Sequence, residues 1–118
     1  MDEMDWSMTP EGTVKEIVKS YLRSRNVASL SASMSNPVGY YRMHVPNGYG
    51  TPALDFEGCY KGRFFAIETK ARNGVPSAMQ WMIMKAHANA LGFSIWGDDG
   101  EAICRRLGEF FDHVDTLA

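Results

Sequence analysis

The sequence predicts a single α/β domain in which a mixed central sheet is flanked by helices, in the order α-β-β-β-α-β-α. Apolar residues recur every three or four positions in three segments, and four other segments are short runs rich in β-branched and aromatic residues. The 118 residues suffice for one domain, and 45% hydrophobic and 22% charged residues are ordinary values for a globular protein. We expect residues 9–118 to form this domain and residues 1–8 to be a loose tail.

The first helix is predicted to begin after Thr9, a hydroxyl N-cap that is followed by a proline and an acid. It continues to about Arg25. Its apolar residues stand at helical spacing: Val14, Ile17, Val18, Tyr21 and Leu22.

Two glutamates of this helix are expected to differ in direction. On a helical wheel Glu11 lies near the centre of the apolar stripe, whereas Glu16 lies nearly opposite to it. We therefore expect Glu11 to point toward the body of the protein and Glu16 to be a solvated partner of Lys19 or Ser20.

Three strands are predicted to follow, at residues 38–45, 53–60 and 63–70. The turn-rich run at residues 46–50 ends the first strand, and Lys61 with Gly62 joins the other two as an antiparallel hairpin. The three strands are therefore expected to form a meander.

The second half of the chain alternates between helix and strand. Ser77 and Gln80 have the spacing of a capping box, which predicts a helix that ends at Gly92. A short strand at residues 93–96 and a helix from Glu101 to about His113 complete the pattern. The last helix, which carries Phe110 and Phe111, is expected to complete the core, with a dimer contact as the alternative.

Two acids and an amine are expected to converge on one end of the hairpin. Side chains alternate between faces along a strand, so Glu68 and Lys70 share one surface. A turn at residues 61–62 places Asp55 toward the same end of the adjacent strand. A surface salt bridge remains the alternative reading of the Glu-x-Lys pattern taken alone.

Carboxylates about 4 Å apart repel each other by roughly 4 kcal/mol at an effective dielectric constant near 20, so this arrangement needs cations. Lys70 offsets one charge, and a divalent ion offsets the remainder. Mg²⁺ or Mn²⁺ fits oxygen ligands, and no Cys/His cluster offers a zinc site because the two cysteines, Cys59 and Cys104, are far apart in sequence.

Four sequence elements resemble the PD-(D/E)XK nuclease superfamily and, within it, the VRR-NUC (virus-type replication-repair nuclease) family. They occur in the expected order between about residue 8 and residue 97. They are Thr9-Pro10-Glu11-Gly12, then Asn47-Gly48-Tyr49-Gly50 before Leu54-Asp55-Phe56, then residues 62–71 with Glu68-Thr69-Lys70, and finally Pro76-Ser77-Ala78-Met79-Gln80. One departure is Leu54, which stands where the superfamily usually has proline.

This resemblance implies a restriction-endonuclease-like core and a role for each matching residue. Asp55 and Glu68 would be metal ligands, with the Thr69 carbonyl as a further one. Glu11 would reach the metal directly or through water, and Lys70 would activate the attacking water. The resemblance also implies that Gln80 supports Lys70 and the scissile phosphate.

Two of these residues also have simpler readings. Gln80 needs no catalytic role to complete a capping box. Glu11 is also explained as a first-turn acid that complements the helix dipole.

The function implied is a divalent-metal-dependent endonuclease that hydrolyses DNA, selective for branched forms such as Holliday junctions and acting as a homodimer. It would need no small-molecule cofactor or membrane and would act in the cytoplasm of a bacterium or phage-infected host. One alternative is a non-catalytic DNA-binding or assembly protein that keeps the fold. Another is a small-molecule-binding or partner-docking domain, suggested by the eight methionines, with Met79, Met82 and Met84 in the second helix, although core filling explains them more simply.

Charge distribution is compatible with DNA. Residues 12–72 hold nine Lys or Arg against four Asp or Glu, although the whole chain has a formal net charge of −2. Candidate phosphate contacts are Lys15, Lys19, Arg42, Lys61, Arg63 and Arg72. Tyr40, Tyr41 and Tyr49 are candidates for base stacking, with Tyr40 or Tyr41 in the core because they alternate on a strand. His44 and His87 are expected to be structural.

Overall fold

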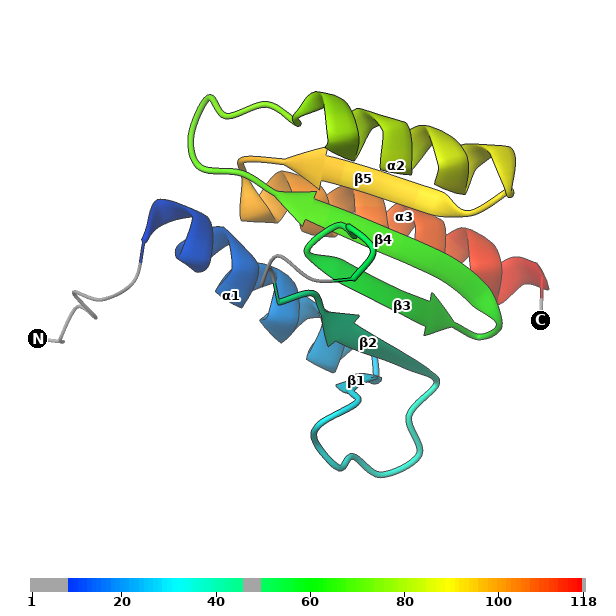
Figure 1. The fold of residues 1–118 in the computed structure, drawn as a ribbon. Helices are drawn as coiled ribbons and strands as arrows, with labels where there is room; N and C mark the ends of the chain where they lie inside the picture. The colour runs from blue at the N-terminus through cyan, green and yellow to red at the C-terminus, as the bar shows by residue number, and fades with distance from the viewer. Residues whose placement is uncertain (1–8, 46–49, 118) are drawn as a thin grey trace, which may run out of the picture.

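The computed structural model describes residues 9–45 and 50–117, and Figure 1 shows them as one twisted sheet with helices packed against it. The predicted α/β class with a mixed sheet is confirmed. The expected tail at residues 1–8 and the turn residues 46–49, including Tyr49, lie outside the described residues. The elements are α1 (Pro10–Ser24), β1 (Val27–Ser29), β2 (Gly39–Met43), β3 (Phe56–Tyr60), β4 (Arg63–Thr69), α2 (Ala78–Asn89), β5 (Phe93–Gly97) and α3 (Gly100–Leu117).

The sheet has the strand order β1-β2-β3-β4-β5. Strands β2, β3 and β4 form the predicted antiparallel meander, and β1 and β5 each run parallel to their neighbours. Lys61 and Gly62 both have positive φ, 46° and 87°, which suits the tight turn between β3 and β4. The predicted order was wrong in one respect, because the three-residue strand β1 is an additional element between α1 and β2.

Strand β3 begins at Phe56, three residues later than predicted. Leu54 is buried against Ala66 and Met84, whereas Phe56 belongs to the cluster on the other side of the sheet. A regular strand would place residues 54 and 56 on the same face. The chain therefore bends at Asp55, just before the strand begins.

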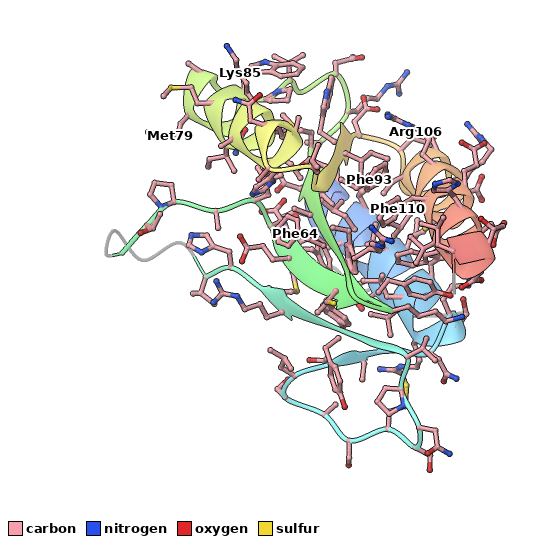
Figure 2. The ribbon with its side chains drawn as sticks, turned by 90° about the vertical axis from the view of Figure 1, so that its right-hand side faces the viewer. Phe64, Met79, Lys85, Phe93, Arg106 and Phe110 are labelled. Carbon is pink, nitrogen blue, oxygen red and sulfur yellow. The ribbon has the colours of Figure 1, made fainter. Side chains whose placement is uncertain are left out.

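The main core lies between the sheet and helices α1 and α3. Phe111 is fully buried at its centre, and its ring stacks on Tyr60 at a centroid distance of 4.0 Å. Phe93 and Phe110, labelled in Figure 2, stack at 4.3 Å and extend this cluster toward β5. The last helix therefore completes the core as expected and continues to Leu117, beyond its predicted end.

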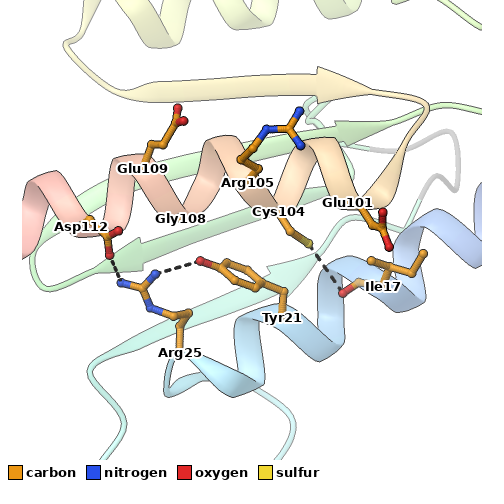
Figure 3. A pocket seen from close by; sticks show the side chains of 9 residues that line it. All are labelled: Ile17, Tyr21, Arg25, Glu101, Cys104, Arg105, Gly108, Glu109 and Asp112. Atoms are coloured by element: carbon orange, nitrogen blue, oxygen red, sulfur yellow. Dashed lines mark hydrogen bonds and ion pairs between the residues drawn. The ribbon is translucent and has the colours of Figure 1, made fainter.

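Helices α1 and α3 pack closely and leave a shallow groove between them (Figure 3). Arg25 donates there to the Tyr21 hydroxyl at 2.8 Å and to Asp112 at 2.9 Å. Burial, with the negative charges of nearby acids, raises the pKa of the Cys104 thiol to about 11. Cys104 and the exposed Cys59 are both free thiols.

The opposite face of the sheet is covered by α2 over β4 and β5. This second core is small and consists of Leu54, Ala66 and Met84 with Ile83 and Trp96 beside them. The capping box is confirmed, since Ser77 and Gln80 exchange both hydrogen bonds. Core filling accounts for Met84 but not for Met79 and Met82, whose side chains lie 50% and 65% exposed. Met79 and Lys85 project from α2 in Figure 2.

Within the described ranges, no helix is both long enough and apolar enough to cross a membrane.

Candidate active site

Asp55 and Glu68 come together at the end of the β3–β4 hairpin that lies opposite its turn. Phe56 pairs with Ile67 across the two strands, so the residues one step beyond them are neighbours. The Asp55 backbone N–H donates to Glu68 Oε1 at 3.2 Å. The register of the two strands therefore makes Asp55 and Glu68 neighbours, as predicted.

The Asp55 carboxylate is oriented by Thr69. Its Oδ2 atom accepts a hydrogen bond from the Thr69 backbone N–H at 2.9 Å and a second from the Thr69 hydroxyl at 2.7 Å. Thr69 is fully buried, so these donors are fixed in place. Sequence reasoning had considered the Thr69 carbonyl and had missed the hydroxyl.

Glu68 is a buried acid with polar partners on the α2 side of the sheet. Its residue is 3% exposed, and its Oε2 atom accepts from Gln80 Nε2 at 3.0 Å. Lys70 Nζ lies 3.5 Å from the same oxygen. Burial first, and then the negative charge of Asp55, raise the pKa of Glu68 to about 7, against the opposing effect of Lys70.

Gln80 serves two purposes at once. Its Oε1 atom accepts from the Ser77 backbone N–H at 2.8 Å, and its amide nitrogen donates to Glu68. The two readings offered by the sequence, cap and site residue, are therefore compatible. The capping box fixes the orientation of the amide that Gln80 presents to Glu68.

Glu11 is connected to Asp55 through Lys15, which binds both carboxylates. Lys15 Nζ is 2.6 Å from Glu11 Oε2 and 3.7 Å from Asp55 Oδ2. Among the residues that the structure describes, no three His, Cys, Asp or Glu side chains group as metal ligands. Lys15, predicted as a phosphate contact, thus links the helix α1 glutamate to the strand aspartate.

The oxygen donors fit a hard divalent cation. Asp55 and Glu68 supply carboxylate oxygens, which are the ligands that Mg²⁺ and Mn²⁺ prefer. Burial first, and then the negative charge of Asp55, make the ionised form of Glu68 unfavourable, and the positive charge of Lys70 offsets this only in part. A divalent ion between the two carboxylates would supply more positive charge.

The other predicted contacts are spread over the molecule. Lys61 binds Asp115 at 2.7 Å. It stands six residues along the hairpin from Asp55, about 20 Å away at the rise of a strand, and the exposed Arg63 starts the next strand beside it. Arg72 is exposed and follows the end of β4, two residues after Lys70.

Two of the ring side chains singled out from the sequence, Tyr41 and His87, have structural settings. Tyr41 is buried against Phe56, whereas Tyr40 is 46% exposed, so the expectation that one of the two is core is confirmed. The His87 ring lies 2.6 Å from the Ser94 hydroxyl, as expected of a structural histidine.

Compared with models of known protein families and with curated proteins, the chain matches none.

Proposed function

We propose that the protein is a divalent-metal-dependent endonuclease of the PD-(D/E)XK type, related to the VRR-NUC family, that hydrolyses DNA phosphodiester bonds. The observation that carries this proposal is the hydrogen-bonded pair of Asp55 and Glu68, with Lys70 beside it where the inner strands β3 and β4 of a mixed sheet meet. The sequence motifs that resemble this superfamily contain the same three residues.

Asp55 and Glu68 would hold the metal ion, with the Thr69 carbonyl as a further ligand. When bound, Mg²⁺ polarises a phosphodiester and lowers the pKa of water. Thr69 keeps the Asp55 carboxylate in a single orientation through two hydrogen bonds. Gln80 does the same for Glu68. Both carboxylates are thus positioned before any cation arrives, which limits the entropy lost on binding.

Lys70 is the group that orients the attacking water. Its ammonium lies 3.5 Å from Glu68 and its side chain is 17% exposed, so it is close to the carboxylates and still reachable from solvent. Its backbone N–H donates to the Gly97 carbonyl at 2.8 Å, which anchors the residue to β5. From this position Lys70 orients the water and stabilises negative charge that develops on the phosphate.

Incubation of the protein with plasmid and with a labelled four-way junction tests the activity. Cleavage is expected in Mg²⁺ or Mn²⁺ and not in EDTA. Asp55→Asn and Lys70→Ala should each lower the rate by about 100-fold or more, as loss of charge-stabilising groups does. Lys85→Ala, an exposed lysine of α2, is the matched control and should keep the wild-type rate.

A chain of this size has little room for a separate module that reads base sequence. We therefore expect a homodimer to recognise the shape of the DNA and to cut the four-way junction faster than linear duplex. Tight binding without cutting in either metal would instead favour the non-catalytic DNA-binding protein. Cutting that continues in EDTA would contradict the proposed chemistry.

A pair of variants on α1 tests the contribution of Glu11. Glu11→Ala removes the partner of Lys15 beside Asp55 and should weaken cleavage severely. Glu16→Ala removes an exposed carboxylate that binds Lys19 at 2.8 Å and should leave the cleavage rate at saturating DNA nearly unchanged. The reverse order would refute the role of Glu11.

A further inference from the structure

A depression opens beside α1 where the edge strand stops early. Strand β1 ends at Ser29, which pairs with Tyr41, whereas β2 continues for two more residues to Met43. The space beyond β1, about 550 Å³, is closed on its other side by α1. We call it the α1 notch. It is lined by Glu16, Lys19, Arg23, Ser29, Leu30, Ser31, Ala32, Tyr41, Arg42 and Met43.

Among the residues that the structure describes, three cations and one acid line the α1 notch. Lys19 and Arg42 each bind a carboxylate, Glu16 at 2.8 Å and Glu57 at 3.0 Å. Such exposed pairs contribute little, about 0 to 1 kcal/mol, so both cations are available to a competing anion.

Arg23 is the most available of these cations. Within residues 9–45 and 50–117 its side chain is exposed and makes no ion pair or hydrogen bond. It also lines a second depression of about 390 Å³, which shares Ser29, Ala32 and Tyr41 with the first. The hydroxyls of Ser29 and Ser31, 2.9 Å apart, offer further donors to a phosphate oxygen.

The notch is in line with the candidate active site. Lys15, Lys19 and Arg23 follow each other at intervals of four residues, which places them along one side of α1. Lys15 is the cation 3.7 Å from Asp55, and Arg23 lies about 12 Å farther along the helix axis. Along the axis of a DNA duplex each strand has one phosphate about every 3.4 Å, so this distance spans three to four phosphates of one strand.

We propose that the α1 notch binds the sugar-phosphate backbone of the DNA strand that enters the active site, with Arg23 as its main phosphate contact. This inference rests on the proposed function, since it is that site which makes DNA the ligand. The cations are distributed along a line rather than gathered around one point, and this arrangement suits the repeated charges of a strand better than a single free phosphate. Arg23 is a substrate-positioning residue, remote from the scissile bond.

Binding of a fluorescent oligonucleotide in EDTA, at several salt concentrations, tests the notch without any cleavage. Arg23→Ala should weaken binding several-fold at low salt and reduce the slope of log K against log salt by about 0.9 for duplex DNA, the value for one lost phosphate contact. Arg106→Ala, an exposed arginine on α3 that lines neither depression, is the matched control and should change neither quantity. Glu16→Gln removes the one acid of the notch and should tighten binding.

The outcomes separate the notch from the proposed function. If Arg23→Ala binds like Arg106→Ala, or if the wild type binds no DNA, the inference is overturned. If Arg23→Ala binds DNA more weakly than the wild type, but the wild type cuts no DNA in any metal, the notch is supported and the nuclease proposal fails. Inorganic phosphate at matched ionic strength should not displace the oligonucleotide, and displacement would point to a free-phosphate site instead. In cleavage assays Arg23→Ala should raise KM and leave kcat near the wild-type value.

Discussion

The two faces of the sheet differ in what they bury. Among the described residues, the face covered by α1 and α3 holds a cluster of fourteen buried residues, with four aromatic rings among them besides Phe111. The cluster on the face covered by α2 has three buried residues among those described. On the same face, at the end of β4, Glu68 contacts Lys70 and Gln80. Burial of apolar surface is the main stabilising contribution in folding, so one face supports the fold while the other can accommodate charged groups.

The largest expected difference between the faces is in core truncation. Phe111→Ala should lower the free energy of unfolding by about 3–5 kcal/mol, because its ring contacts Tyr60 and Phe65 in the large cluster. Met84→Ala, in the small cluster, should fall at the lower end of the usual range, about 2 kcal/mol. Urea denaturation of both variants measures the two values, and equal losses would contradict the comparison.

The acid on the α2 face should make stability depend on pH. The pKa of Glu68 is raised to about 7 from 4.5, so the folded protein holds a proton that the unfolded chain releases between these values. Without metal, the free energy of unfolding should therefore be greatest below about pH 4.5 and fall as pH rises to about 7, by up to about 3 kcal/mol.

Chemical denaturation in EDTA at pH 5 and pH 8 measures this change. Glu68→Gln has no carboxyl group at this position and should lose less stability over the same interval. A wild type and variant with the same pH profile would show that Glu68 titrates normally.

Two adjacent residues of β3 compare the faces directly. A Cβ added at Gly58 would lie 2.5 Å from both the Phe65 ring and the Tyr40 carbonyl oxygen, so Gly58→Ala should destabilise the protein by about 1–3 kcal/mol. Cys59 is exposed on the other face, and Cys59→Ala should change stability by less than about 0.5 kcal/mol. Thermal denaturation of the two variants should therefore give clearly different midpoints.

A smaller loss of stability than at Gly58 is expected at the start of α2. Ser77→Ala removes the hydroxyl that accepts from the Gln80 backbone N–H, which should cost about 1 kcal/mol. Because Met84 is the buried residue of α2, hydrogen exchange should increase mainly in this helix. Thr9→Ala at the cap of α1 is the control, and exchange there should rise less, since α1 buries three residues.

The features predicted correctly from the sequence depend on local signals. The caps of α1 and α2 and the hairpin at Lys61 and Gly62 are determined by neighbouring residues. Strand β1 was missed because three residues carry no periodic pattern, and its strand character comes from pairing with β2. The bend at Asp55 was missed because Leu54 and Phe56 face different helices, which only the packed structure determines.

The site shows the same division. Asp55 and Glu68 could be paired in advance because hairpin register relates the two strands. Lys15 lies forty residues from Asp55, so its position between Glu11 and Asp55 depends on how α1 crosses the sheet. The bond from the Thr69 hydroxyl to Asp55 and the α1 notch likewise depend on how the end of a strand meets another part of the chain.

Calorimetric titration with Mn²⁺ at pH 8, above the pKa of Glu68, tests the carboxylate pair most directly. The wild type should bind the ion, and Glu68→Gln should lose that binding while remaining folded. Glu57→Gln, which alters a strand β3 acid paired with Arg42, should bind like the wild type. Equal Mn²⁺ binding by the wild type and Glu68→Gln, or none by either, would contradict the account.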